Sequence, residues 1–361
     1  MKSILYIGWV GFNNLGDELM YDIFRRHVLQ SGKDFKLTPI NNETPYLRQI
    51  SMTDYDYVVL GGGSLIGDHQ HPFDPYLFEC LAAAVQANRK VVIWGSGMDW
   101  LPRSVLSSLL ANEADPLQLP DHVLAPVRQV FSQSYWCGVR GPLSQSLLAS
   151  VGIPGIKICG DPAFLMSPPQ MEQDTPSDRR AEPIIGVNWG TAYNRIYGSN
   201  EASVEEALVE ALRDLQAQGY TLYFYTMWDQ DREPAQRLYH KLATSGKAVF
   251  DPHIHHQDAF VNLISQFEYT INFKLHASYI SLAARVPFIA LGYRFKVYDF
   301  AHSVNMAPYV VATDAFDLKE QLLQKASLIP SLREVLVETM ATAQQQYAER
   351  IVEPFKMELF N

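Results

Sequence analysis

Short apolar segments that end in glycine-rich turns recur along this chain, and segments of helical periodicity separate them. In the first half, the strand-like segments cover residues 4–8, 57–60, 91–94, 135–139 and 156–159. Strands that are apolar on both faces and separated by helices are typical of parallel sheets with helices on both sides. The first half of the chain is therefore predicted to be an α/β domain.

The alternation stops at residues 167–183 and then begins again. This segment is rich in proline, charged and small polar residues and has no periodic apolar face, which is typical of a linker. After it, further strand-like segments cover residues 184–188, 221–225, 247–250, 269–272 and 288–291, and a long helical pattern covers residues 332–351.

These patterns predict an α/β fold made of two Rossmann-like domains that face a cleft. Such sheets bind ligands beyond the carboxyl ends of their strands, where the glycine-rich turns lie. The predicted divisions are an N-terminal domain at residues 1–166, a linker at residues 167–183, a C-terminal domain at residues 184–330 and a C-terminal helix at residues 331–361.

Composition excludes several function classes. The chain has 29 Lys and Arg against 39 Asp and Glu, a formal net charge of −10. A broad nucleic-acid surface needs clustered Lys and Arg, so no nucleic-acid partner is expected, whereas a small anion in a local basic pocket remains compatible. The three scattered cysteines predict reduced thiols instead of a disulfide framework. No segment has the pattern of a secretion signal or a membrane span, so we expect a cytoplasmic protein.

Two glycine-rich turns, at residues 8–18 and 61–68, follow predicted strands. Glycines let a ligand approach the backbone, and the helix that comes next presents free N–H groups to it. A tight turn with Asp17 as the helix cap is the alternative that needs no ligand. The candidate ligand contacts in these turns are Asn13, Asn14, Gly62, Gly63 and Ser64.

Basic side chains also stand where predicted strands end. Arg140 precedes a helix and is placed to bind an anion bidentately, or it forms a structural ion pair, for instance with Asp161. Lys274 and His276 lie two residues apart after the strand at residues 269–272. A cation there can hold a phosphate while a histidine transfers a proton near neutral pH, although a structural histidine is the alternative.

The histidines at 253, 255 and 256 form the one segment with the appearance of a metal site. Metal sites need three or four convergent ligands, and no carboxylate or cysteine spacing accompanies His253, His255 and His256. A polar loop is therefore predicted here, and no metal is expected.

Six motifs occur along the chain in the order GFNNLGDE, GGGSLIGD, GVRGPLS, GDPAF, GVNWGTAYNRIYG and KLHASYISLAARVPFIALGY. Their order and spacing resemble the polysaccharide pyruvyltransferase family over residues 3–299. The resemblance implies a fold similar to GT-B glycosyltransferases. It also implies transfer of a pyruvyl group from phosphoenolpyruvate to saccharide hydroxyls, which forms a ketal and releases phosphate without any cofactor. The implied acceptor is a saccharide or lipid-linked saccharide. Attachment to the inner face of the membrane is also compatible with the sequence.

The resemblance also implies roles for particular residues. The family's basic–Leu–His motif falls on Lys274, Leu275 and His276, with Lys where the family often has Arg. His276 is the implied general acid. The implied substrate contacts are Lys274, Arg140, Arg195 and Asn188. In a chain of net charge −10, a triply anionic donor requires cations to be concentrated, and we expect that concentration at Lys274, Arg140 and Arg195.

Two other functions are compatible with this architecture. One is a nucleotide-sugar-dependent glycosyltransferase of the GT-B type, and the other is a non-catalytic glycan-binding protein of the same fold. The fold alone does not choose among them. Thermal stabilisation by phosphoenolpyruvate or by nucleotide sugars distinguishes a pyruvyltransferase from a glycosyltransferase. An assay of phosphate release distinguishes a pyruvyltransferase from a non-catalytic glycan-binding protein.

Overall fold

The structure, a computed structural model, describes all residues except 114–116, 170–181, 199, 358 and 361. Most of the linker predicted at residues 167–183 thus lies outside the described residues. The chain divides into two compact units. The first comprises Met1–Leu165, Arg294–Ser303 and Gln345–Asn361, and the second comprises Met166–Tyr293 and Val304–Gln344.

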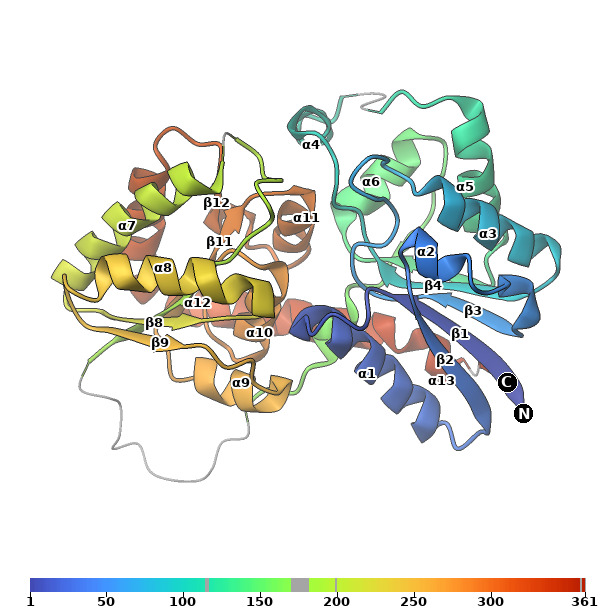
Figure 1. Cartoon of the computed structure of the whole chain (residues 1–361), viewed down its shortest axis with the longest axis horizontal. Coiled ribbons are helices and arrows are strands. Elements are labelled where there is room, and N and C mark those ends of the chain that lie inside the picture. The colour runs from blue at the N-terminus through green and yellow to red at the C-terminus, as the bar shows by residue number, and fades with distance from the viewer. Residues whose placement is uncertain (114–116, 170–181, 199, 358, 361) are drawn as a thin grey trace. The chain divides into compact units, whose positions relative to one another are not determined.

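The first unit is built on a six-stranded parallel sheet in the order β2-β1-β3-β4-β5-β6 (Figure 1). Its strands are β1 (Lys2–Gly8), β2 (Phe35–Asn41), β3 (Tyr57–Leu60), β4 (Lys90–Ser96), β5 (Trp136–Val139) and β6 (Lys157–Ile158). The chain runs from β1 to β2 on one side and returns to β3 on the other. The strand order therefore reverses between β1 and β3, which is where α/β sheets bind ligands.

Helices cover both faces of this sheet. They are α1 (Leu15–Gln30), α2 (Thr44–Leu47), α3 (Pro75–Gln86), α4 (Arg103–Leu110), α5 (Asp121–Gln133), α6 (Pro142–Ser150), α11 (Phe295–Ser303) and α13 (Glu353–Lys356). Helix α1 lies on one face, and α3 and α5 pack together on the other (Figure 1). The indole Nε1 of Trp94 on β4 donates a hydrogen bond to the Ile351 carbonyl oxygen at 2.8 Å. This bond ties the late segment of the chain to the first sheet.

The second unit contains another six-stranded parallel sheet, in the order β12-β11-β10-β7-β8-β9. Its strands are β7 (Ile184–Asn188), β8 (Thr221–Tyr225), β9 (Ala248–Asp251), β10 (Tyr269–Asn272), β11 (Phe288–Gly292) and β12 (Val310–Ala312). The order reverses between β7 and β10, so the loops after these two strands lie at the switch point of this sheet.

The helices of the second unit are α7 (Glu201–Ala217), α8 (Arg232–Leu242), α9 (Gln257–Ile264), α10 (Leu275–Ala283) and most of α12 (Leu318–Ile351). Helices α7 and α8 lie together on one face, and α9 and α10 lie together on the other (Figure 1). The predicted two-Rossmann-like α/β architecture is confirmed in each unit.

Several element predictions differ from the structure for identifiable reasons. The long helix begins at Leu318, well before the predicted start at residue 332, and continues through Pro330. Strand β2 was missed because it contains Pro39, which an edge strand tolerates. Strand β12 was missed because it has only three residues.

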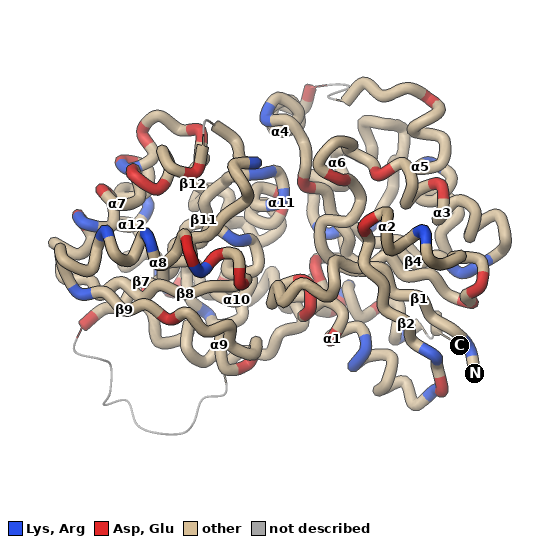
Figure 2. The backbone as a smooth tube through the Cα atoms, in the orientation of Figure 1, with Lys and Arg blue, Asp and Glu red and all other residues tan. Residues whose placement is uncertain are grey.

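Charged residues of both signs are interspersed along the two units (Figure 2). Cys80, Cys137 and Cys159 are free thiols. Of the helices in the described residues, none is both long enough and apolar enough to cross a bilayer.

Candidate active site

Asn188 connects the two strands at the switch point of the second unit. It is the last residue of β7 and is buried. Its Oδ1 accepts a hydrogen bond from the Lys274 backbone N–H at 2.9 Å, and its Nδ2 donates to the Tyr225 carbonyl oxygen at 3.2 Å. The amide therefore fixes the start of α10 against β7 and β8, while direct contact with substrate stays a prediction.

Lys274 is the N-cap residue of α10, and its side chain is held in place. The Nζ atom donates to the Thr191 carbonyl oxygen at 2.6 Å and forms an ion pair with Asp231 Oδ1 at 3.1 Å. It also lies 5.0 Å from the centre of the Trp228 ring. The side chain is 15% exposed, so the ammonium retains access to solvent.

Asp231 is the partner that the sequence reasoning missed. It follows β8 and is fully buried. Burial raises the pKa of Asp231, and the adjacent Lys274 opposes that rise. Asp231 could have been predicted from its position shortly after the carboxyl end of a strand, because Lys274 was predicted from the same kind of position.

His276 lies in the first turn of α10, two residues after Lys274. It is partly buried, its Nε2 atom is shielded from solvent, and its ring centre lies 5.7 Å from that of Tyr279. Lys274 and His276 therefore both lie at the bend between β10 and α10. Its catalytic use stays a prediction.

Arg195 belongs to the same unit and lies in the loop between β7 and α7. Its side chain is exposed, and its backbone N–H donates to the Ala192 carbonyl oxygen at 3.0 Å. Arg140, the third cation of the predicted concentration, belongs to the first unit. The second unit thus contributes Lys274 and Arg195.

The first glycine-rich turn of the other unit begins α1. Asn14 is the N-cap residue, and its Oδ1 accepts a hydrogen bond from the Gly16 N–H at 3.1 Å. The cap is therefore Asn14, and the assignment of that role to Asp17 is wrong. Asn13 is exposed and adopts a positive φ of 52°, a conformation that asparagine tolerates better than most residues.

The second turn is packed tightly against the first unit's own residues. A Cβ at Gly62 would lie 2.5 Å from Cδ of Pro162, so glycine is required there for packing. Gly63 has a φ of 104°, and its carbonyl oxygen accepts from the Gly97 N–H at 2.8 Å. The turns after β3 and β4 are therefore joined by a backbone hydrogen bond.

Arg140 is fully buried in the first unit. Its guanidinium donates to Ser64 Oγ at 3.1 Å and to the Met98 carbonyl oxygen at 2.8 Å, and its Nε lies 3.9 Å from Asp299 Oδ2. This geometry favours a structural ion pair, and Asp299 is a carboxylate partner of Arg140. Contact between Arg140 and an anionic substrate stays a prediction, and Ser64 is engaged by the same guanidinium.

Asp299 in turn holds the start of α6. Its Oδ1 accepts from the Leu143 N–H at 2.8 Å, and its Oδ2 accepts from the Ser144 hydroxyl at 2.6 Å. A Cβ at Gly141 would lie 2.2 Å from the same carboxylate, so glycine permits this close approach.

The titration of Asp161 is expected to make the stability of the first unit depend on pH. Burial raises the pKa of Asp161 to about 6, although Arg140 and the Ala163 N–H oppose the rise. Between about pH 4 and 6 the folded state therefore holds a proton that the unfolded state has released, so stability falls as pH rises through this window. We expect wild type to lose about 2 kcal/mol relative to Asp161→Asn between pH 4 and 7.

Urea unfolding of the two proteins at several pH values measures this difference. Asp34→Asn, at an exposed carboxylate, is the matched control. A stability difference between wild type and Asp161→Asn that does not vary with pH would contradict the assignment.

A second basic cluster was missed in the sequence. Asp99, after β4, forms ion pairs through Oδ2 with Arg294 at 3.0 Å and Lys296 at 3.2 Å. The Arg294 guanidinium lies 3.9 Å from the centre of the Trp100 ring. Both cations face the same carboxylate oxygen, and both are slightly exposed. The signal was their position just after the strand predicted at residues 288–291.

The histidine-rich loop after β9 is organised by Asp251. Its carboxylate accepts hydrogen bonds from His253 Nδ1 at 2.9 Å, from His255 Nε2 at 2.6 Å and from the Tyr223 hydroxyl at 2.8 Å. Burial alone would raise the pKa of Asp251, but these bonds lower it to about 2. Within the described part of the chain, no group of three or more His, Cys, Asp or Glu side chains is arranged to hold a metal ion.

Solved structures share this architecture at low sequence identity. The UDP complex of MnaA from S. aureus aligns with 100% of this chain and 97% of its own, at a TM-score of 0.59 and 13% identity. A putative UDP-N-acetylglucosamine 2-epimerase from Listeria monocytogenes aligns at 99% and 96%, with a TM-score of 0.60 and 12% identity. HepE of Anabaena with UDP-glucose aligns at 100% of both chains, with a TM-score of 0.55 and 10% identity. These likenesses establish the fold.

Among curated protein sequences, none matches this chain. The family model described as polysaccharide pyruvyl transferase matches residues 14–294, which is most of the chain and includes Arg140, Lys274 and His276. The protein therefore belongs to the polysaccharide pyruvyl transferase family.

Proposed function

We propose that this protein transfers the pyruvyl group of phosphoenolpyruvate to two hydroxyls of a saccharide, forms a cyclic ketal and releases phosphate. The observation that supports this most strongly is the position of Lys274 and His276. In a chain of this family, they stand together at the start of α10, at the switch point of a parallel sheet.

The chemistry assigns a proton transfer to His276. Protonation of the donor at C3 makes C2 electrophilic, and His276 supplies that proton. One saccharide hydroxyl then adds to C2 and gives its proton back to the neutral His276. A neighbouring hydroxyl forms the second C2–O bond as the bond from C2 to the phosphate oxygen breaks. The phosphate leaves with the electron pair of that bond and takes up the proton of the second hydroxyl. These steps balance without a redox cofactor or a metal.

The cations described in each unit suit an anionic donor. Lys274 is paired with Asp231, so that pair is neutral, and the exposed Arg195 in the loop after β7 adds positive charge to the same unit. In the first unit, Arg294 and Lys296 place two cations beside Asp99. Cations fixed before the reaction stabilise charge that develops on the leaving phosphate.

Phosphate release tests the proposal directly. The purified protein is incubated with phosphoenolpyruvate and a panel of free and lipid-linked saccharides. We expect phosphate release that depends on an acceptor, together with an acceptor whose mass increases by one pyruvyl ketal. Thermal stabilisation by nucleotide sugars alone, without phosphate release, would favour a GT-B-type glycosyltransferase and reject the proposal.

A further inference from the structure

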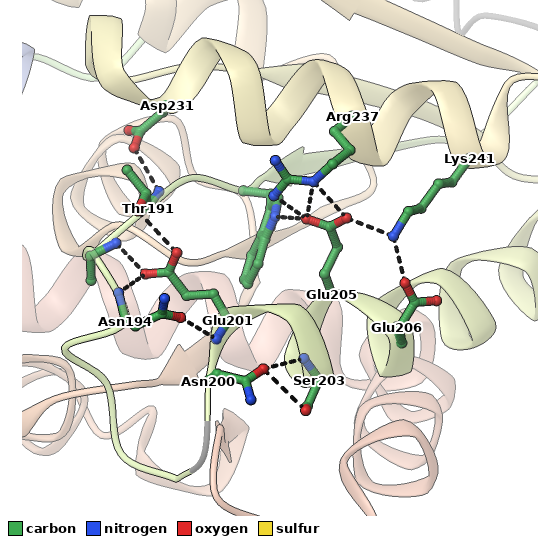
Figure 3. Close-up of polar contacts among 12 residues, drawn as sticks. Thr191, Asn194, Asn200, Glu201, Ser203, Glu205, Glu206, Asp231, Arg237 and Lys241 are labelled. Atoms are coloured by element: carbon green, nitrogen blue, oxygen red, sulfur yellow. Dashed lines mark hydrogen bonds and ion pairs between the residues drawn. The ribbon is translucent and has the colours of Figure 1, made fainter.

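The loop at residues 190–194, between β7 and α7, is held by carboxylates from two different elements (Figure 3). Glu201 Oε2 accepts from the Thr191 hydroxyl at 2.9 Å, and its Oε1 accepts from the backbone N–H groups of Ala192 at 2.5 Å and Asn194 at 3.0 Å. These contacts fix a loop whose backbone at Asn194 has a φ of 57°.

Asp231 holds the other side of the loop. Its Oδ1 accepts from the Thr191 N–H at 3.1 Å, and the carboxylate points toward Thr191 (Figure 3). A Cβ at Gly190 would lie 2.2 Å from this oxygen, so a glycine is needed for the carboxylate to approach the backbone so closely. The same oxygen forms the ion pair with Lys274.

The ammonium of Lys274 therefore meets two groups that are themselves fixed. The Thr191 carbonyl oxygen accepts from Nζ at 2.6 Å, and Asp231 Oδ1 lies at 3.1 Å. Lysine ordinarily has a flexible stem and a rotatable ammonium, so this double attachment selects one position among many. Asp231 Oδ2 is buried and makes no hydrogen bond with the described residues, which an ordinary structural carboxylate avoids.

We propose that Asp231 is a positioning residue: through its Oδ1 it sets the place of the Lys274 ammonium at the start of α10, so that the cation meets the leaving phosphate of the donor. This inference rests on the proposed function. Asp231 itself does not contact the reacting atoms and acts through Lys274. Burial raises the pKa of Asp231 and Lys274 opposes this rise, as expected of a coupled pair.

The first experiment compares Asp231→Asn with Glu205→Gln. Glu205 is also a buried carboxylate of the second unit, but its partners are Trp189, Arg237 and Lys241 (Figure 3). Asp231→Asn is expected to lower kcat by about 10- to 100-fold, because a misplaced group costs this much, and to change the KM for phosphoenolpyruvate far less. Glu205→Gln is expected to lower thermal stability while kcat of the folded protein is retained.

Equal kcat values for Asp231→Asn and wild type would overturn the inference. So would a loss of kcat in Asp231→Asn that Glu205→Gln reproduces at the same loss of thermal stability, because that pattern indicates a structural role.

A double-mutant cycle tests whether Asp231 acts through Lys274. If it does, adding Asp231→Asn to Lys274→Met is expected to change kcat very little beyond the effect of Lys274→Met alone. Multiplicative losses of kcat in the double variant would contradict the proposed route.

A measurement without catalysis separates this inference from the proposed function. Wild-type protein that releases no phosphate with any acceptor rejects the proposed function. The labelling rate of Lys274 by an amine-acylating reagent, followed by mass spectrometry, still reports its attachment. Asp231→Asn is expected to raise that rate several-fold, whereas Glu205→Gln leaves it unchanged. An unchanged rate in Asp231→Asn would show that Asp231 does not hold Lys274.

Discussion

Replacement of His276 by alanine is expected to lower phosphate release from phosphoenolpyruvate by about 10²–10⁴-fold, the usual contribution of a general acid. The substitution removes the only histidine of α10, and no other side chain in its first turn can supply a proton near neutral pH. Initial rates at saturating donor and acceptor, with phosphate measured continuously, provide the comparison.

The design must separate loss of chemistry from loss of folding. His276→Gln retains most of the side-chain volume and is expected to show the same loss of rate with an unchanged melting temperature. His27→Ala is the matched control, because His27 is partly buried and stacks on Phe355 at 4.9 Å between ring centres in the first unit. Full turnover by a folded His276→Ala protein would remove His276 from the mechanism.

Replacement of Arg140 by methionine is expected to destabilise the first unit by about 3–5 kcal/mol, because it leaves buried carboxylates without their cation. Asp299 and Asp161 are both fully buried, and Arg140 lowers the pKa of each against the effect of burial. Methionine fills a similar volume, so the loss reports charge more than packing. Urea unfolding followed by tryptophan fluorescence measures the shift in midpoint.

Two further variants test the cause of that shift. Adding Asp299→Asn to Arg140→Met is expected to recover part of the stability, since it removes one uncompensated carboxylate. Arg25→Met breaks an exposed pair with Asp22 and is expected to change stability by less than about 1 kcal/mol. A midpoint for Arg140→Met equal to that of wild type would show that the ion pair does not support the fold.

The sequence predicted those features that depend on local pattern. The strands at residues 57–60, 184–188, 221–225 and 269–272 were placed correctly because an apolar run that ends in a polar or glycine-rich turn fits a buried parallel strand. The start of α12 was placed wrongly, at residue 332 instead of Leu318. A proline such as Pro330 ordinarily ends a helix, but here it lies inside one.

The partners within each site depend on contacts between distant parts of the chain. Asp299 binds Ser144 across 155 positions, and Thr191 binds Lys274 across 83. Local pattern therefore predicted Arg140 and Lys274 as candidate site cations but gave no means of naming Asp299 or Asp231 as the carboxylates beside them.

The division of the chain between its two units has a consequence for synthesis on the ribosome. The first unit begins with residues 1–165 but also requires residues 294–303, which bring Asp299, and residues 345–361, which include Ile351, the acceptor for Trp94. Until those residues have left the ribosome, Arg140 cannot form its ion pair with Asp299, and Trp94 on β4 cannot donate its hydrogen bond to the Ile351 carbonyl oxygen. We therefore expect the nascent N-terminal portion to remain open to proteases and chaperones while the second sheet, whose strands are contributed by residues 184–312, is being completed.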